Sequence, residues 1–192
     1  MKPWWSRGNE EMKLKCSVYI ATSLDGYIAK PNGDIEWLHN PEYGPMDEGG
    51  LSYEQFISGI DVIVMGRNTY EKVLEFNPWP YEGTTVVVLT NRSLEIPGES
   101  QKKVITASGE PKHVVQELAG RGFRNLYIDG GLTIQRFLAA GLIDEITITQ
   151  IPIILGDGIP LFGKMDNEFP LKLIDSTVYE NGFVQFRYVV KK

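Results

Sequence analysis

Short runs of apolar residues, rich in β-branched side chains, recur along the chain and are separated by polar turns. The runs at 62–65, 84–89 and 125–128 have the length and composition of buried strands. Helix start and stop signals frame further segments, which we expect to be helical: 53–58, 70–75, 113–120 and 133–140. Because strands alternate with helices, the pattern predicts an α/β fold with a mainly parallel sheet and right-handed crossovers.

The other strands predicted from the pattern lie at 14–21, 104–106, 144–152, 171–179 and 183–190. The last two flank Asn181-Gly182, a strong hairpin signal, so we expect an antiparallel edge on the sheet. Residues 1–12 are polar and have no apolar stretch. We therefore predict a flexible N-terminal extension at 1–12, followed by one domain that spans 13–192.

Composition narrows the classes of partner and compartment. The chain has 192 residues and a net charge of −6, which argues against nucleic acid or an anionic membrane surface as a partner. No apolar run approaches the ~18 residues that a membrane span needs. Cys16 is the single cysteine, so no internal disulfide can form and a reducing compartment is expected. These features predict a cytoplasmic protein.

One stretch, 60–73, suggests a phosphate contact. The predicted strand ends at Gly66, and Asn68 or Thr69 can cap a helix that starts near Tyr70. A strand that turns through glycine into a helix start presents free backbone N–H groups, which suit an anion. Arg67 lies in the turn and can add a charge-assisted hydrogen bond. The alternative is a strand-to-helix connection without a ligand.

Three predicted strands end in similar turns, at 65–69, 89–93 and 128–133. The carboxyl ends of parallel strands line one crevice of an open α/β sheet, and ligands bind there. Together the turns supply backbone donors, hydroxyls and two arginines, which fits a dinucleotide. The Gly-x-Gly-x-x-Gly fingerprint of Rossmann folds is absent, so we expect a different binding mode.

The order of several short blocks resembles the dihydrofolate reductase superfamily. The blocks are Val18–Ala21, Asp25–Ile28, Trp37, Val62–Tyr70, Val86–Thr90, Leu126–Gly131 and Phe137–Leu138. Ser23-Leu-Asp-Gly26 and the segment Ile154–Phe162 resemble the branch that contains the reductase domain of riboflavin biosynthesis and stand-alone dihydrofolate-reductase-like proteins. The resemblance implies a three-layer α/β/α fold, NADPH as cofactor and a homodimer.

The resemblance also implies a set of cofactor contacts. Ala21 and Ile28 would flank the nicotinamide, and Gly66, Arg67, Asn68 and Thr69 would hold the pyrophosphate. Thr90, Asn91, Arg92 and Ser93 would surround the adenosine 2′-phosphate, and Gly130, Gly131, Leu132, Thr133 and Ile134 would contact the cofactor from the other side. Arginine and hydroxyl groups suit a 2′-phosphate, whereas NAD is usually held by a carboxylate on its ribose.

The substrate side leaves alternatives open. Ile28 and Trp37 are candidate substrate contacts, although Trp37 can instead plug the base of the long loop at 30–50. The candidate proton donors are Asp25, Glu54 or bound water, but Asp25 also suits a turn and Glu54 a solvated helix face. His39 and His113 are isolated, so no metal site is expected.

The resemblance predicts an NADPH-dependent reductase of a small heterocyclic or imine-bearing substrate, resembling 5-amino-6-(5-phosphoribosylamino)uracil reductase. The alternatives are dihydrofolate reductase activity and a regulatory NADP-binding module without catalysis.

Overall fold

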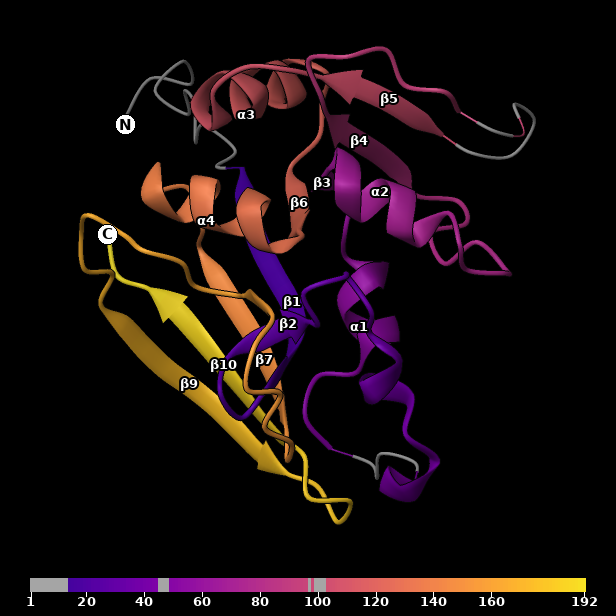
Figure 1. Cartoon of the computed structure of the whole chain (residues 1–192). Helices are drawn as coiled ribbons and strands as arrows, with labels where there is room; N and C mark the ends of the chain where they lie inside the picture. The colour runs from indigo at the N-terminus through magenta and orange to yellow at the C-terminus, as the bar shows by residue number, and fades with distance from the viewer. Residues whose placement is uncertain (1–13, 45–48, 97, 99–102) are drawn as a thin grey trace, which may run out of the picture.

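The computed structural model describes residues 14–44, 49–96, 98 and 103–192, and the predicted extension at 1–12 lies outside them. An eight-stranded sheet has the order β5-β4-β3-β6-β1-β7-β10-β9 (Figure 1). Its strands are β1 (Lys15–Ser23), β3 (Val62–Gly66), β4 (Thr85–Leu89), β5 (Val104–Ala107), β6 (Asn125–Asp129), β7 (Glu145–Ile151), β9 (Leu171–Val178) and β10 (Val184–Val190). The neighbours in the order β5-β4-β3-β6-β1-β7 are all parallel. Strand β10 runs antiparallel to β7, and β9 runs antiparallel to β10. The predicted sheet is confirmed.

Helices cover both faces of the sheet. Successive strand residues point to opposite faces, so neighbouring residues of one strand pack with different helices. On one face, Ile63 and Met65 pack with residues of α1 (Tyr53–Ser58) and α2 (Arg67–Val73). On the other, Val62 and Val64 pack with α3 (Pro111–Gly120) and α4 (Gly131–Ala139). We call these the α1/α2 face and the α3/α4 face. The three layers agree with the predicted fold class.

The helices begin at positions that differ in part from prediction. Ser52 caps α1 as expected: its hydroxyl accepts from the Gln55 amide at 3.2 Å, and the Gln55 side chain accepts from the Ser52 amide at 3.1 Å. The predicted caps of α2, Asn68 and Thr69, are wrong. The helix begins at Arg67, and Gly66 occupies the N-cap position without a side-chain hydrogen bond. The amides that start α2 therefore have no side-chain cap.

The long connections carry short elements of their own. The loop at 30–50 contains two 3₁₀ turns, η2 (Glu36–His39) and η3 (Pro41–Tyr43). A two-stranded ribbon joins β2 (Tyr27–Ala29) to β8 (Ile159–Pro160). The side-chain amide of Gln135 donates to the carbonyls of Pro160 and Leu161, both at 3.1 Å, and so ties this ribbon to α4.

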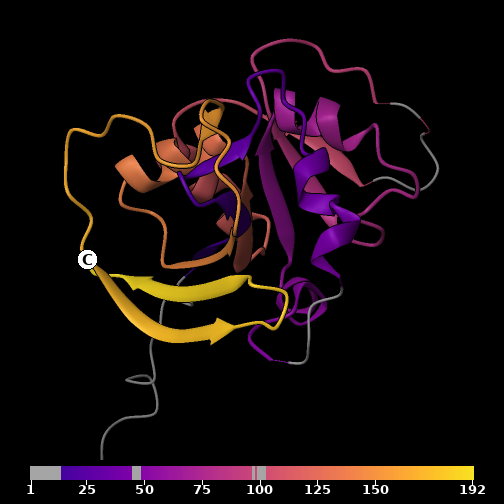
Figure 2. The ribbon, with the colours of Figure 1, turned by 60° about the horizontal axis from the view of Figure 1, so that its bottom comes forward.

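The C-terminal hairpin of β9 and β10 turns at Asn181-Gly182, as predicted. Gly182 has φ 84°, and the Phe183 amide donates to the Asn181 side chain at 3.0 Å. Figure 2 shows β9 and β10 at one margin of the molecule, while the helices gather over the other strands.

Candidate functional site

The strand order places a switch point between β3 and β6, and we call the region at the carboxyl ends of these two strands the β3/β6 crevice. These parallel strands are neighbours, with Met65 paired to Asp129. The helix after β3 packs on the α1/α2 face, and the helix after β6 packs on the α3/α4 face. Where the connections of adjacent strands leave in opposite directions, the carboxyl ends of the strands form a ligand crevice. The predicted turns at 65–69 and 128–133 lie at these two strand ends, and we call them the two walls of the crevice.

The two walls interlock through glycine and threonine. A Cβ added at Gly130 would overlap the Thr69 hydroxyl, and a Cβ at Gly66 would lie 3.2 Å from the Thr133 hydroxyl. Gly130 also has φ 84° and ψ 137°, which side chains rarely adopt. Gly130 therefore leaves no room for a side chain beside Thr69, and Gly66 leaves little room beside Thr133.

The first turn of α4 contributes backbone rather than side chains. Its N-cap position, Gly130, has no side-chain hydrogen bond. Thr133 and Ile134 are buried, whereas Leu132 is 72% exposed. A Cβ at Gly131 would lie 3.1 Å from the Ile28 side chain, so the β2–β8 ribbon reaches this turn. The structure thus brings predicted residues of both walls and Ile28 together.

Two arginines lie near the strand ends. The third predicted turn follows β4, whose Leu89 pairs with Gly66 of β3. In it, the Arg92 amide donates to the Thr90 hydroxyl at 3.1 Å, and the side chains of Asn91, Arg92 and Ser93 are exposed. Arg67 forms an exposed ion pair with Glu71, with 2.6 Å between Nε and Oε1. An exposed ion pair of this kind contributes little to stability, so Arg67 can exchange Glu71 for a ligand phosphate.

The predicted acids, Asp25 and Glu54, are both exposed. The Asp25 carboxylate accepts from the amides of Leu155 at 3.1 Å and Gly156 at 2.8 Å. The Ser23 hydroxyl and these amides lower the pKa of Asp25. Hydrogen bonds from its own amide and from Ser52 lower the pKa of Glu54. Both groups are stabilised as carboxylates, and the contacts of Asp25 tie its turn to the distant segment at 155–156.

Trp37 and Ala21 belong to a separate hydrophobic cluster. Trp37 is 6% exposed and packs with Ile151, Tyr179 and Phe183, and Ala21 packs against this group. This position matches the alternative in which Trp37 plugs the base of the loop.

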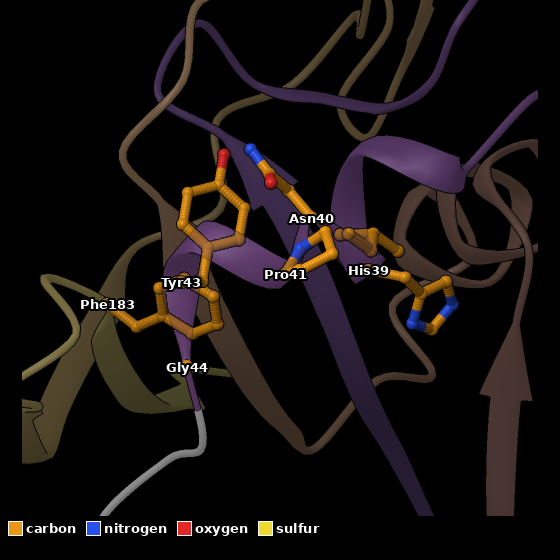
Figure 3. Close-up of a pocket in the computed structure, with 7 residues that line it drawn as sticks. His39, Asn40, Pro41, Tyr43, Gly44 and Phe183 are labelled. Atoms are coloured by element: carbon orange, nitrogen blue, oxygen red, sulfur yellow. The ribbon is translucent and has the colours of Figure 1, made fainter.

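A neighbouring cavity of about 400 Å³ opens between the loop and the hairpin (Figure 3). Leu38, His39, Asn40, Pro41, Tyr43, Gly44 and Phe183 line it. None of the predicted site residues lines this cavity.

Asp129, the last residue of β6, is an acid that the sequence reasoning did not select. Its carboxylate accepts from the Gly130 amide at 2.8 Å and from the Tyr81 hydroxyl at 3.2 Å. Burial raises the pKa of Asp129, and the hydrogen bonds offset this only in part. The sequence shows an aspartate directly before the double glycine, but it does not show the burial that raises the pKa of that aspartate.

Three phenol side chains surround Asp129 on the α1/α2 face. Burial raises the pKa values of Tyr53, Tyr81 and Tyr127, and the charge of Asp129 adds to each shift. The Tyr127 hydroxyl donates to the Tyr19 carbonyl at 2.8 Å, which joins β6 to β1. The crevice therefore combines uncapped backbone amides with a carboxyl group in a protonation-favouring environment.

Other site types find no support in the part of the chain that the structure describes. It holds no group of three His, Cys, Asp or Glu side chains placed to bind a metal. Its helices are all too short or too polar to cross a bilayer.

Comparison with known proteins identifies the family. The model of the RibD C-terminal domain matches residues 15–185. The uncharacterized protein YwjB of Bacillus subtilis (strain 168) is 36% identical over 181 residues, which cover 93% of this chain and 99% of YwjB. A crystal structure of a putative riboflavin biosynthesis protein from Shewanella sp. PV-4 has a TM-score of 0.83 and 40% identity, covering 93% of this chain and 100% of that one.

The fold likeness extends to dihydrofolate reductase. The enzyme from Enterococcus faecalis, solved in complex with NADP(H), has a TM-score of 0.57 at 17% identity and covers 93% of this chain and 97% of its own. At that identity the likeness concerns the fold alone. The family match and the two closer relatives together show that this chain belongs to the RibD C-terminal domain family.

Proposed function

We propose that this protein is an NADPH-dependent reductase that transfers hydride to a small heterocyclic or imine-bearing substrate. The reaction would resemble that of 5-amino-6-(5-phosphoribosylamino)uracil reductase. The observation that carries the proposal is the pair of interlocked walls at the β3/β6 crevice, where Gly66 faces Thr133 and Gly130 faces Thr69. Membership of the RibD C-terminal domain family supports the reaction class.

In this proposal the cofactor lies across the crevice and is held mainly by backbone groups. The turn at Gly66–Thr69 and the first turn of α4 supply amides for the pyrophosphate. The exposed Arg92 and Ser93 supply charge and a hydroxyl for the 2′-phosphate. Ile28, which reaches Gly131, would border the nicotinamide with Ala21. The bound dinucleotide would supply the hydride.

We assign the proton-handling role to Asp129 in place of Asp25 or Glu54. A group that donates a proton near neutral pH needs a raised pKa. Burial raises the pKa of Asp129, whereas hydrogen bonds lower those of Asp25 and Glu54. Asp129 also directly precedes Gly130 at the end of β6.

The proposed setting is cytoplasmic, because the single cysteine, Cys16, is buried and reduced and the chain is acidic. We further propose that residues 13–192 form a single domain, since the family model spans 15–185.

Two measurements test the function. NADPH and NADH are titrated by fluorescence against the purified chain and its Arg92→Ala variant, with Arg121→Ala as a control because Arg121 is the C-cap residue of α3. We expect NADPH to bind more tightly than NADH and only Arg92→Ala to lose that preference. NADPH oxidation is then followed with dihydrofolate, a ribosylaminopyrimidine, quinones and imines. Failure to bind NADPH would refute the proposal, and binding without any acceptor would favour the regulatory module.

A further inference from the structure

A layer of aromatic rings lies between α1 and the sheet, close to Asp129. The Tyr19 ring stacks on the Phe56 ring with centroids 4.9 Å apart, and the Phe56 ring meets the Tyr127 ring edge to face at 5.0 Å. The Tyr53 ring contacts the Tyr19 ring edge to face at 5.8 Å. Because rings that pack in this way hold one another, this layer fixes the position of Tyr53 in the first turn of α1.

Tyr53 and Asp129 are the accessible groups at this place. Both are half-buried, whereas Tyr81 and Tyr127, which also surround Asp129, are buried. The Tyr53 hydroxyl has no hydrogen-bond partner among the residues that the structure describes. The Asp129 carboxyl lies near enough for its charge to act on Tyr53. A phenol hydroxyl and a carboxyl group are therefore both open to a ligand at the end of β6.

The segment that contains α1 carries only negative charge. Residues 31–66 include seven aspartates and glutamates and no lysine or arginine, so this segment is more negative than the whole chain, whose net charge is −6. Burial raises the pKa values of Tyr53 and Tyr81, and the carboxylates that add to these shifts are Asp129 and Glu54. The electrostatic surroundings of the aromatic layer are thus acidic.

The cations that border this segment have other partners. Lys30, directly before it, forms an ion pair with Asp34, with 2.8 Å between Nζ and Oδ2. Arg67, directly after it, belongs to the turn that the proposed function assigns to the cofactor pyrophosphate, and Arg92 belongs to the turn assigned to the 2′-phosphate. The crevice therefore combines a cofactor side that has arginines with a second side that has phenols and carboxyl groups.

We propose that the hydride acceptor is a planar, unphosphorylated ring compound that binds beside Tyr53 and Asp129. This inference rests on the proposed function and narrows its substrate class. NADPH gives a hydride to a double bond of the acceptor, one proton is added, and NADP⁺ leaves. Tyr53 offers a ring and a hydroxyl, and the carboxyl oxygens of Asp129 can accept from a ring N–H. A phosphate on the acceptor would lose water near carboxyl groups without gaining a cation.

Binding of matched ligand pairs tests the inference without turnover. The ligands 5-amino-6-ribosylaminouracil and riboflavin, each with its own 5′-phosphate, are titrated by calorimetry against the full chain, with and without NADP⁺. A cleft lined by one sign of charge changes the association rate of a charged ligand by about 10- to 1000-fold, so each phosphate should bind about 10-fold or more weakly than its partner at low salt. High salt should reduce the difference, because it screens charge but does not change ligand size.

Two results would overturn the inference: a phosphate that binds as tightly as its unphosphorylated partner, or two pairs of which no member binds. NADPH oxidation is followed with the same four ligands and with the quinones and imines named above. Preferential binding of the unphosphorylated ligands without oxidation of NADPH by any acceptor would refute the reductase activity alone. Reduction that favours the phosphorylated partner would instead refute the substrate class and leave the reductase activity standing.

Charge variants test whether the local field causes the preference. Glu54→Lys, next to Tyr53, should reduce the difference in affinity within each pair several-fold. The control Glu168→Lys makes the same change in net charge shortly before β9, whose start lies at the other end of the sheet, near the start of β7. It should keep the difference. Circular dichroism checks that both variants fold. No change in Glu54→Lys, or an equal change in both variants, would contradict the proposal.

Discussion

Gly130 is the position where the crevice depends most sharply on one residue. Replacing it with alanine adds a methyl group that overlaps the Thr69 hydroxyl. It also forces a side chain into φ 84° and ψ 137°, at a backbone cost of about 1–3 kcal/mol. Overpacking adds about 1–3 kcal/mol. We therefore expect Gly130→Ala to lower the free energy of unfolding by about 2–6 kcal/mol.

Gly26 offers a matched control. It has the same φ of 84°, and a Cβ added there would meet nothing within 4 Å. Gly26→Ala should therefore carry the backbone cost alone, about 1–3 kcal/mol. Urea unfolding of the two variants under identical conditions gives the comparison. If Gly130→Ala is no more destabilising than Gly26→Ala, the close approach of the two walls is refuted.

A double-mutant cycle separates the two costs. Thr69→Ala removes the hydroxyl that the new methyl group meets, so the pair Gly130→Ala/Thr69→Ala should recover the overpacking share, about 1–3 kcal/mol. We expect NADPH affinity to be low both in Gly130→Ala and in the double variant, because the added methyl group remains at the wall proposed to hold the cofactor. Full recovery of both stability and NADPH binding would argue that the walls touch each other but do not bind the cofactor.

Four further changes test other parts of the structure. Ser52→Ala removes the capping box of α1 and should cost about 1 kcal/mol in urea unfolding. Gln185→Ala leaves the Leu51 amide without its acceptor, at a cost of about 1–3 kcal/mol by the same assay. Arg92→Ala should weaken NADPH binding about 10- to 100-fold in fluorescence titration, because a hydrogen bond to a charged group contributes about 1.5–3 kcal/mol. Burial raises the pKa of Asp129, so its protonated form stabilises the fold at low pH and that contribution is lost as the pH rises through the folded-state value. The free energy of unfolding of the wild type should therefore fall relative to that of Asp129→Asn over that rise in pH. A constant difference between the two free energies would refute the raised pKa.

The sheet could be predicted because its strands are continuous apolar runs between turn signals. Val62–Met65 is buried on both sides, and no helical periodicity competes with it. The start of α1 could also be predicted, since Ser52 and Gln55 are three residues apart. The start of α2 could not: Gly66 takes the cap position without a side chain, and Asn68 and Thr69 are good cap residues that lie inside the helix.

The surroundings of the acids depend on contacts between distant segments. Asp25 receives its hydrogen bonds from Leu155 and Gly156, and Asp129 receives one from Tyr81. The second contact requires β6 to insert beside β3, an order that strand composition does not determine. Sequence periodicity therefore located the turns but could not rank the carboxyl groups within them.

Asp25 and Asp129 make this limit concrete. Each stands in an Asp-Gly pair, and the following glycine has φ 84° in both. The hydroxyl and amides around Asp25 favour the charged form and lower its pKa. The protein interior around Asp129 disfavours the charged form and raises its pKa. Two local sequences with the same turn signal thus become a structural tie and a carboxyl group with a raised pKa. Because Asp129, unlike Asp25, ends a strand of the β3/β6 crevice, our proposed assignment of the proton donor depends on the strand order rather than on the turn motif.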